Sequence, residues 1–372
     1  MLLCLFSFNK YKAVLKIYLR RIHLAIAWVT CLFLFILSLT GAILIYAKDI
    51  QRLVNPDIWT VEPTDRPLNI AHIAHIAHIV QKVQKKAGFD INFITVEQQP
   101  DLAWQAQLNN GDYVSINPYT AEVLQRYNYY QTLYGFTMAL HRWLVLKNED
   151  GTTPLRNWVS SVALLLILEV LIGFILWIRP KKRLKRLKVK FTAKRKVFYN
   201  QVHTVLGVYF FLPLMLIAFS GIAFNWSQQT AWLVEKALNQ PIEYRKPAPL
   251  VLSKAAGYDV ENSIKQGMAA LPEAQLYRVY FPKETSQPLM LRMQMPGETH
   301  AYSYVWMDPY SAQVLQVQDG SKAGFSTQVW NFRYKFHIGD FAGPIVQFLW
   351  FVICFFPVLF AATGIYMWVS RK

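Results

Sequence analysis

Apolar side chains gather in four long runs along this chain. The runs cover residues 24–47, 158–178, 205–224 and 345–369. Each is close to the ~20 residues that a helix needs to cross the hydrocarbon of a bilayer. Pro357 lies within the fourth run, where a membrane helix tolerates a kink. The pattern therefore predicts a membrane protein with four transmembrane helices.

The first apolar run lies near the N-terminus, where a signal peptide would also be found. It is longer than the apolar part of a signal peptide, and its end, GAILIYAKD, lacks the small-x-small cleavage pattern. We therefore expect this run to be an uncleaved anchor.

Two long polar segments separate the apolar runs, and parts of them alternate as β-strands do. The first segment contains the runs INFITVEQ, LAWQAQL and YVSINP, and the second contains LYRVYF, LMLRMQM and YSYVWMD. Alternation and β-branched or aromatic side chains favour strands. Residues 68–87 and 253–271, which precede these runs, have a helical pattern. Each segment is thus expected to fold as one helix packed on a small antiparallel sheet.

The two halves of the chain resemble one another. The stretch VSINPYTAEVLQ at 114–125 matches VWMDPYSAQVLQ at 305–316, and GFILW at 173–177 matches GIYMW at 364–368. His23 and Gly41 are separated by the same interval as His203 and Gly221. Internal self-similarity of this kind indicates a tandem duplication. Each half would then contain a helix, an external domain and a second helix, with both halves in the same orientation.

Positive charge is concentrated beside the apolar runs. The stretch RPKKRLKRLKVKFTAKRK at 179–196 holds eleven Lys and Arg and no acidic residue. Because Lys and Arg mark cytoplasmic loops, both termini and this loop are predicted to be cytoplasmic and the two polar segments external. The net charge of +17 is therefore interpreted as a membrane feature and not as a nucleic-acid interface.

The predicted fold class is a four-helix membrane bundle, built by tandem duplication, with two external α+β domains. The predicted parts are the cytoplasmic start and first transmembrane helix (1–48), the first external domain (49–135), an external helix and the second transmembrane helix (136–180), the basic loop (181–200), the third transmembrane helix (201–226), the second external domain (227–335) and the fourth transmembrane helix (336–372).

Two features of these segments resemble a known family. A helix and short strands that close on D-P-x-[ST]-G-x-[VIL] are similar to the PepSY domain, although Ala121 and Ala312 stand where that motif prefers Gly. Lone histidines at the starts of helices, in RRIHLAIAW, ALHRWL, NQVHTVLGVY and KFHIGDFAG, resemble those of PepSY-associated transmembrane proteins. The resemblance covers nearly the whole chain.

The resemblance implies a function as well as a fold. The family includes reductases of the bacterial inner membrane that carry two b-type haems and reduce ferric siderophores. It implies that both external domains are periplasmic and that reduction releases Fe(II) for iron uptake. The sequence has no C-x-x-C-H motif, so a haem would not be covalently attached, and no G-x-G-x-x-G fingerprint. The electron donor would therefore be a separate cytoplasmic protein or a quinol.

Four histidines near helix ends are the candidate haem ligands. By the predicted topology, His23 and His203 lie on the cytoplasmic side, and His141 and His337 lie on the external side. Two ligands at each level is what two six-coordinate haem irons need. A single histidine at a membrane interface is more often an anchor, but four that are paired by depth and by duplication favour ligation.

Basic and small residues accompany these histidines. Arginines that could pair with haem propionates lie beside them: Arg20 and Arg21 next to His23, Arg142 after His141, and Arg333, followed by Lys335, before His337. Arg20 and Arg21 also fit a topology signal. Small residues give each helix a point of close approach, for haem binding or for plain helix packing: Thr40-Gly41, Gly173, Ser220-Gly221 and Thr363-Gly364.

Glu169 is the acidic residue within the second apolar run, LLLILEVLIG. An acid within a membrane is costly and usually faces the bundle interior. It could hydrogen-bond a haem ligand, take up a proton, or have no role in the chemistry.

The most conspicuous histidines are His72, His75 and His78, at every third position of IAHIAHIAHIVQ. They would share one helix face and could bind a metal weakly. The second half has no counterpart, and the isoleucines beside them can face a core, so we expect a solvated face. Two other functions stay open: a membrane-anchored module that binds peptide without redox chemistry, and a transporter component with a site at the repeat interface.

Overall fold

The computed structural model describes residues 2–64, 91–178, 183–243 and 259–370. The chain folds into two compact units. The helical unit consists of residues 1–45, 137–233 and 333–372, and the sheet unit consists of residues 46–136 and 234–332. Both units therefore take segments from both halves of the duplication.

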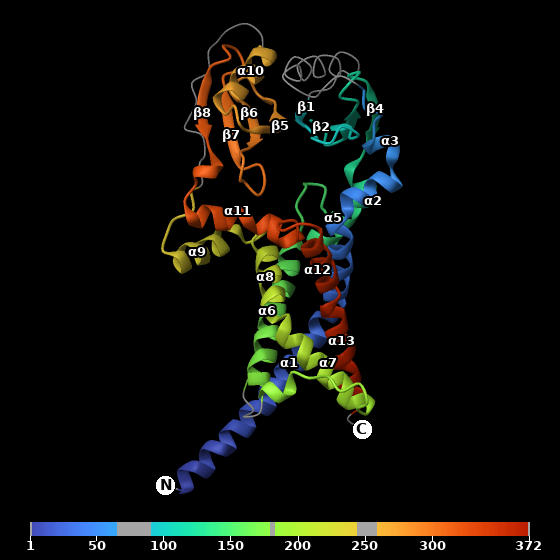
Figure 1. Ribbon diagram of the computed structural model, residues 1–372, viewed down its shortest axis with the longest axis vertical. Helices are drawn as coiled ribbons and strands as arrows, with labels where there is room; N and C mark the ends of the chain where they lie inside the picture. Colours follow the sequence, from blue (N-terminus) through green and yellow to red (C-terminus); the bar gives the residue numbers. More distant parts are fainter. Residues whose placement is uncertain (1, 65–90, 179–182, 244–258, 371–372) are drawn as a thin grey trace. The chain divides into compact units, whose positions relative to one another are not determined.

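Long helices form the helical unit (Figure 1). They are α1 (Leu2–Ile45), α6 (Arg156–Ile178), α7 (Arg195–Tyr209), α8 (Phe211–Ile222), α12 (Pro344–Cys354) and α13 (Phe356–Val369). Helix α1 packs against α6, α12 and α13, and α6 also packs against α7 and α8. Three shorter helices lie partly in each unit: α5 (Leu133–Trp143), α9 (Ser227–Leu238) and α11 (Phe325–Ile338).

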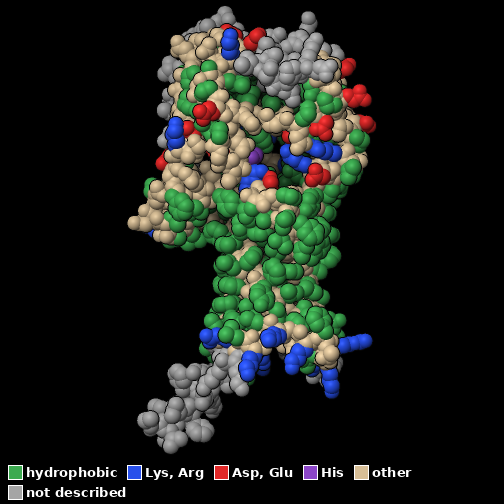
Figure 2. Space-filling view, in the orientation of Figure 1, with side chains coloured by type: hydrophobic (Ala, Val, Ile, Leu, Met, Phe, Trp, Pro, Cys, Tyr) green, Lys and Arg blue, Asp and Glu red, His purple; other side chains and the backbone are tan. Residues whose placement is uncertain are grey.

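The helical unit has the composition of a membrane-spanning bundle. Within the described residues, Val14–Ile45, Arg156–Ile178 and Pro344–Val369 are long and apolar enough to cross a bilayer. Helices α7 and α8 pass the same test together, with a bend of 62° between them. Figure 2 shows hydrophobic side chains along the visible side of this unit and Lys and Arg gathered at one end. The structure thus supports three spanning segments, or four if the bent pair is one span.

Prolines explain why the long helices of the second half are broken. Pro213 cannot donate a hydrogen bond to the carbonyl of Tyr209, the last residue of α7. Pro357 likewise cannot donate to the carbonyl of Ile353, next to the end of α12. A proline inside a helix removes this bond and its ring clashes with the same carbonyl. Helices α1 and α6 of the first half have no proline and are continuous.

One eight-stranded antiparallel sheet forms the centre of the sheet unit, in the order β4-β3-β2-β1-β5-β6-β7-β8. The strands are β1 (Ile91–Thr95), β2 (Trp104–Leu108), β3 (Tyr113–Ile116), β4 (Val123–Tyr127), β5 (Gln275–Tyr280), β6 (Leu289–Gln294), β7 (Ser303–Met307) and β8 (Val314–Gln318). Strands β1 and β5 pair at Phe93–Tyr280, Ile94–Val279 and Thr95–Arg278, which joins the two repeats edge to edge. Helices α2 (Ala47–Val54), α3 (Pro56–Trp59) and α10 (Val260–Ala270) belong to the same unit.

The six predicted strands are present as β1 to β3 and β5 to β7. Of the predicted helix at 253–271, α10 confirms Val260–Ala270, and residues 253–258 lie outside the described residues. The predicted helix at 68–87 also lies outside them. Strands β4 and β8, which follow the two turns, were not predicted. The structure also shows that the strands of the two predicted external domains form one sheet within one compact unit.

Alternation along the strands builds a single core on one face of this sheet. Ile94, Val114, Val279 and Leu291 have no exposed surface and belong to one apolar cluster. Ile264 of α10 is also fully buried in this cluster. On the opposite face the same strands carry larger polar and aromatic side chains, because successive residues of a strand point to opposite sides.

The two turns that carry the duplicated motif have the same hydrogen bonds. Ala121 donates its N–H to the carbonyl of Asn117, and Ala312 donates to the carbonyl of Asp308. The side chains of Asn117 and Asp308 each accept two further backbone N–H groups from their own turns. Ala121 and Ala312 have φ of 58° and 56°, the left-handed region that favours glycine. This conformation explains why the resembling motif prefers Gly at these two positions.

Candidate functional site

The four predicted histidines form two pairs in the helical unit. His23 of α1 and His203 of α7 have ring centres 6.2 Å apart and ring planes at 86°. His141 of α5 and His337 of α11 also have ring centres 6.2 Å apart, with planes at 59°. The structure therefore brings together the two pairs that were predicted, and each pair takes one histidine from each half of the chain.

The spacing within each pair suits a metal between two imidazoles. A metal–imidazole bond is about 2.0–2.1 Å and a ring nitrogen lies about 1.1 Å from the ring centre, so two imidazoles on opposite sides of one metal have centres about 6.2–6.4 Å apart. Both pairs have this separation. The separation thus leaves room for one metal atom between the two imidazoles of each pair.

Three of the histidines have their Nδ1 atoms fixed by a hydroxyl group. Nδ1 lies 2.8 Å from Thr363 Oγ1 in His203, 2.9 Å from Thr40 Oγ1 in His141 and 3.0 Å from Ser220 Oγ in His337. Each hydroxyl donates its own hydrogen to a carbonyl of its helix. The hydroxyl oxygen must then accept from Nδ1–H, which leaves the lone pair of Nε2 for a metal.

His23 reaches the same state by a different contact. Its Nδ1 lies 3.2 Å from the backbone carbonyl oxygen of Glu169, which can only accept a hydrogen bond. Nδ1 of His23 is therefore protonated and Nε2 is free to bind. The backbone of Glu169, and not its carboxyl group, makes this hydrogen bond, and Glu169 is also among the residues that line the adjacent cavity. Such contacts to metal-binding histidines fix the tautomer and the ring orientation.

A glycine faces each histidine across the helix contact. A Cβ added at Gly221 would lie 3.2 Å from His337 Cε1, and one at Gly41 would lie 3.4 Å from His141 Cε1. At Gly173 the distance to His23 Cε1 would be 3.6 Å, and at Gly364 the distance to His203 Cε1 would be 4.0 Å. These glycines let the helix backbone approach the imidazole. The sequence left haem binding and plain helix packing as alternatives for these residues, and the structure shows that each glycine packs against a histidine.

The second pair is neutral at physiological pH. Burial, with a smaller contribution from the neighbouring His337, lowers the pKa of His141 to about 3. Burial also lowers the pKa of His337 to about 4. Neutral imidazole is the form that binds metals, because protonation removes the lone pair of Nε2.

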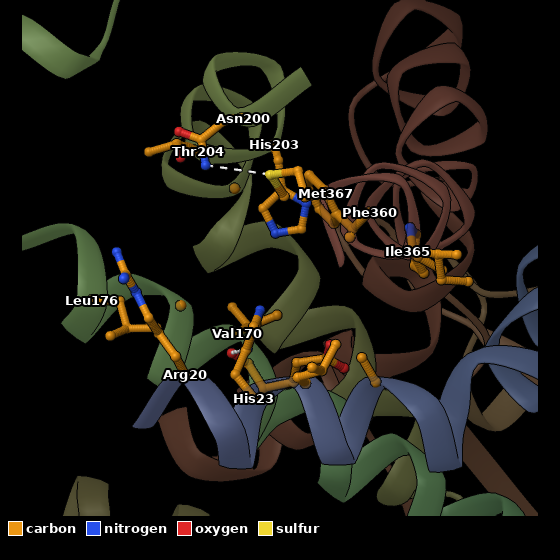
Figure 3. A pocket seen from close by; sticks show the side chains of 18 of the residues that line it. Arg20, His23, Val170, Leu176, Asn200, His203, Thr204, Phe360, Ile365 and Met367 are labelled. Atoms are coloured by element: carbon orange, nitrogen blue, oxygen red, sulfur yellow. Dashed lines mark hydrogen bonds between the residues drawn. The ribbon is translucent and has the colours of Figure 1, made fainter. Parts of the chain in front are cut away.

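A cavity of about 560 Å³ surrounds the first pair. Figure 3 shows Arg20 and His23 on α1, His203 on α7 and Phe360 on α13, with both imidazoles directed into the space between the helices. Its volume lies within the range of about 300–1,000 Å³ typical of small-molecule and cofactor sites. The walls are mostly apolar.

Basic side chains line this cavity. Arg20, Arg186 and Lys196 are among its lining residues, whereas the neighbouring Arg21 is not. The Nε1–H group of Trp177, also in the lining, is buried without a hydrogen-bond partner among the described residues. Two cations from the basic loop region and an indole donor therefore join Arg20 as groups that suit a carboxylate.

The arginines beside the second pair have aromatic neighbours. Arg333 lies over the ring of Phe224 at 5.7 Å, and Phe224 contacts the His337 ring edge-on at 5.4 Å. Arg142 lies over the ring of Trp143 at 5.5 Å. Lys335 forms an ion pair with Asp340. Arg142 and Arg333 thus lie close to the histidine pair, while Lys335 already has an acidic partner.

The two pairs lie at different levels of the bundle. His141 faces Gly41 of α1, and His23 lies on the same continuous helix. With a rise of about 1.5 Å per residue, the stretch of α1 from His23 to Gly41 is about 27 Å long. This length is close to the ~30 Å of bilayer hydrocarbon. The histidine pairs therefore lie toward opposite ends of the membrane-crossing helices.

The conspicuous triplet His72, His75 and His78 lies outside the described residues. Among the residues that the structure describes, no group of three or more His, Cys, Asp or Glu could hold a metal ion. The paired histidines do not form such a group because each pair offers only two ligands.

Family comparison agrees with this architecture. Residues 20–371 match the family described as PepSY-associated TM region. The chain belongs to this family. A search of the curated proteins finds no match. Membership in a transmembrane family, together with the apolar helices, makes this chain a membrane protein with a PepSY-associated architecture.

Sequence reasoning missed some partners of the histidines. Thr40, Ser220 and Thr363 drew attention only as small residues, although each holds an imidazole through its hydroxyl. Each of them directly precedes a glycine, which is visible in the sequence, but only the structure shows that this glycine faces the same histidine. Arg186 and Lys196 were assigned to the topology signal alone, and the structure places both beside the cavity.

Proposed function

We propose that this protein is a transmembrane electron conduit that holds two b-type haems and reduces a ferric chelate on the external side. The observation that carries this proposal is the repeated histidine pair, with the same 6.2 Å separation at both ends of the bundle. The two pairs share their spacing and offer lone pairs on Nε2. An isolated histidine anchor needs none of these features.

The side chains would position the haems in defined ways. His23 and His203 would be the axial ligands of one haem, and His141 and His337 those of the other. The hydroxyls and the Glu169 carbonyl hold each imidazole in the ligating tautomer. When bound, haem supplies a one-electron redox couple, and the protein supplies ligation, spacing and a dry interior.

Cations near each pair would bind the haem carboxylates. Arg20, Arg186 and Lys196 line the first cavity, and Arg142 and Arg333 lie near the second pair. Arginine and carboxylate pair strongly where water is scarce. The sequence suggested both Arg20 and Arg21 as partners of a haem carboxylate, and we assign this role to Arg20 because it lines the cavity.

The overall reaction would be the one-electron reduction of chelated Fe(III) to Fe(II). The electron would come from a separate cytoplasmic protein or from a quinol, which releases two electrons and two protons and so reduces two ferric ions. Fe(II) binds hard oxygen ligands less tightly than Fe(III), so the chelate releases its metal. We place the protein in a bacterial inner membrane, with cytoplasmic termini and the sheet unit in the periplasm, acting in iron uptake.

The test is the visible spectrum and haem content of the purified protein. We expect two b-type haems per chain, reducible by dithionite and reoxidised by a ferric chelate, with Fe(II) captured by a chromogenic chelator. A colourless protein that cannot be loaded with haem would overturn the proposal. That outcome would favour a membrane-anchored peptide-binding module, which needs no cofactor.

A further inference from the structure

Two arginines lie side by side on the face of the sheet that is opposite the apolar core. Arg278 of β5 and Arg292 of β6 are directly paired across neighbouring strands. Like charges at directly opposed positions of a sheet are destabilising. None of the ion pairs recorded in the described part of the chain involves either arginine. Within the described residues, these two adjacent positive charges therefore have no carboxylate at ion-pair distance.

Aromatic rings surround both guanidinium groups. The Arg278 guanidinium lies 4.2 Å from the ring centre of Phe93, and the Arg292 guanidinium lies 5.2 Å from that of Tyr277. Three further ring centres lie close by. The Tyr280 ring centre is 5.7 Å from the Arg278 guanidinium, and those of Tyr302 and Tyr304 are each 6.0 Å from the Arg292 guanidinium. The rings hold the cations by cation–π attraction without neutralising their charge.

The guanidinium groups are oriented through their inner nitrogens. Arg278 Nε donates to Thr95 Oγ1 at 2.9 Å, and Arg292 Nε donates to the carbonyl of Ala301 at 2.7 Å. One terminal nitrogen of Arg278 also donates to the Tyr280 hydroxyl at 3.3 Å. Within the described part of the chain, most of their terminal N–H groups make no other recorded hydrogen bond. These groups form the planar fork that suits a pair of anionic oxygens.

The first repeat shows that the sheet does not need these arginines. Tyr304 corresponds to Tyr113 in the duplicated motif. Tyr304 pairs with Arg292, which pairs with Arg278. Tyr113 pairs with Gln107, which pairs with Phe93. The positions equivalent to the two arginines are therefore neutral in the first repeat.

The pair also lies at the seam between the repeats. Arg278 is paired with Thr95 of β1, and the neighbouring Tyr280 is paired with Phe93. Rings from both repeats, including Tyr113 and Tyr304, lie on this face, and Tyr304 stacks on Trp306 with ring centres 5.7 Å apart and ring planes at 30°. The seam thus combines a cluster of aromatic rings with two cations.

We propose that this seam binds the ferric chelate, and that the chelate is an anion built from aromatic ligands, as a tris-catecholate is. Its rings would stack on the tyrosines and Phe93, and its oxygens would accept hydrogen bonds from Arg278 and Arg292. A neutral hydroxamate chelate has neither the rings nor the net charge that this surface complements. The inference rests on the proposed function for its iron, but binding itself requires no electron transfer.

The test uses gallium(III), which binds the same chelators but is not reduced under these conditions. Full-length protein in detergent is titrated with a gallium tris-catecholate and with a neutral gallium tris-hydroxamate, by equilibrium dialysis with metal analysis. We expect the catecholate to bind at least roughly tenfold more tightly, with an affinity that falls as salt rises. Equal binding of the two chelates, or no binding of the catecholate, would overturn the inference.

Variants locate the binding surface. Arg278→Gln and Arg292→Gln should each weaken catecholate binding roughly tenfold, and Arg278→Lys should weaken it less, because the charge is kept and the fork is lost. Arg126→Gln on β4 removes an exposed arginine already paired with Asp112, and should leave binding unchanged. Unchanged binding in both Gln variants, with circular dichroism like that of the native protein, would exclude this surface.

Haem content of the same preparations separates this inference from the proposed function. Catecholate binding by a protein without haem would support the seam and reject the conduit. Two haems without catecholate binding would do the reverse. Gallium binding and haem loading are independent measurements, so neither failure can hide the other.

Discussion

The two halves of the duplication give the same parts to the histidine pairs but build them differently. Helices α1 and α6 of the first half run without a break, whereas α7–α8 and α12–α13 of the second half are each interrupted before a proline. His203 of the second half bonds to the Thr363 hydroxyl, whereas the equivalent His23 bonds to a backbone carbonyl. Even so, both pairs have the same ring separation.

This difference shows what duplication had to preserve. The histidine, the facing glycine and an acceptor for Nδ1–H occur in both halves. The continuity of the helix and the chemical nature of the acceptor do not. Substitutions of the shared features should therefore affect haem binding more than substitutions of the features that differ, and the histidines should show the largest effect.

The largest effect is expected from the histidines themselves. His23→Ala and His203→Ala should each remove the same one of the two haems, because each removes an axial ligand from the same pair. His141→Ala and His337→Ala should remove the other haem and stop reduction on the external side. Haem stoichiometry and difference spectra measure this. The pairing is wrong if His23→Ala and His203→Ala deplete different spectral components.

A smaller effect should distinguish the hydroxyl contact of the second half from the carbonyl contact of the first. Thr363→Val keeps the shape of the side chain but removes the hydroxyl group that accepts from His203 Nδ1–H. Loss of such a contact typically lowers metal affinity about 10–100-fold. Haem affinity is measured by transfer of haem to apomyoglobin.

Ile172→Val is the matched control, because Ile172 stands before Gly173 where Thr363 stands before Gly364. It should leave the rate of haem loss unchanged, since His23 bonds to the backbone carbonyl of Glu169. Equal losses in Thr363→Val and Ile172→Val would show that packing, and not the hydroxyl, holds the imidazole.

Alanine substitutions of the glycines should differ in effect according to how closely each glycine approaches its histidine. A Cβ at Gly221 would approach His337 to 3.2 Å, which is tighter than usual, while one at Gly364 would lie 4.0 Å from His203, an ordinary contact. Gly221→Ala should therefore lower haem occupancy a few-fold and shift the electron paramagnetic resonance signal of its haem, because the imidazole must move. Gly364→Ala should leave both unchanged. The reverse order would mean that these contacts do not set the imidazole position.

Much of this architecture could be predicted because its signals are local or repeated. Hydropathy located the spanning segments, and the duplication paired His23 with His203 and His141 with His337. Alternation located six strands. Strands β4 and β8 escaped because they are the two edges of the sheet, where VLQRY and VLQVQ bury little surface and need no apolar alternation.

Other features depend on distant contacts that no single segment encodes. The pairing of β1 with β5 joins segments from opposite halves, and the sequence of neither strand identifies the other as its partner. The bend at Phe210 lies inside a run whose hydropathy is uninterrupted, and only Pro213 indicated it. The role of Thr40, Ser220 and Thr363 depends on which rotamer brings a hydroxyl to a histidine on another helix. Residue type alone could not show this.

The smallest effect is expected where the halves differ most visibly in sequence. The triplet His72, His75 and His78 occurs only in the first half, and a function that needs both halves should not depend on it. Replacing all three with Gln should leave haem content and ferric-chelate reduction nearly unchanged. Gln is at least as good a helix former as His, so a helix predicted at 68–87 would persist.

The triple Gln variant is best compared with His141→Ala, which should abolish reduction on the external side. Both variants are measured for haem stoichiometry and for the rate of Fe(II) capture by a chromogenic chelator. The four paired histidines would still hold both haems in the triple Gln variant, so electron flow should continue. A severe loss of reduction in that variant, with both haems still bound, would assign the triplet to substrate or iron binding. The first half would then carry a function of its own that the duplication does not explain.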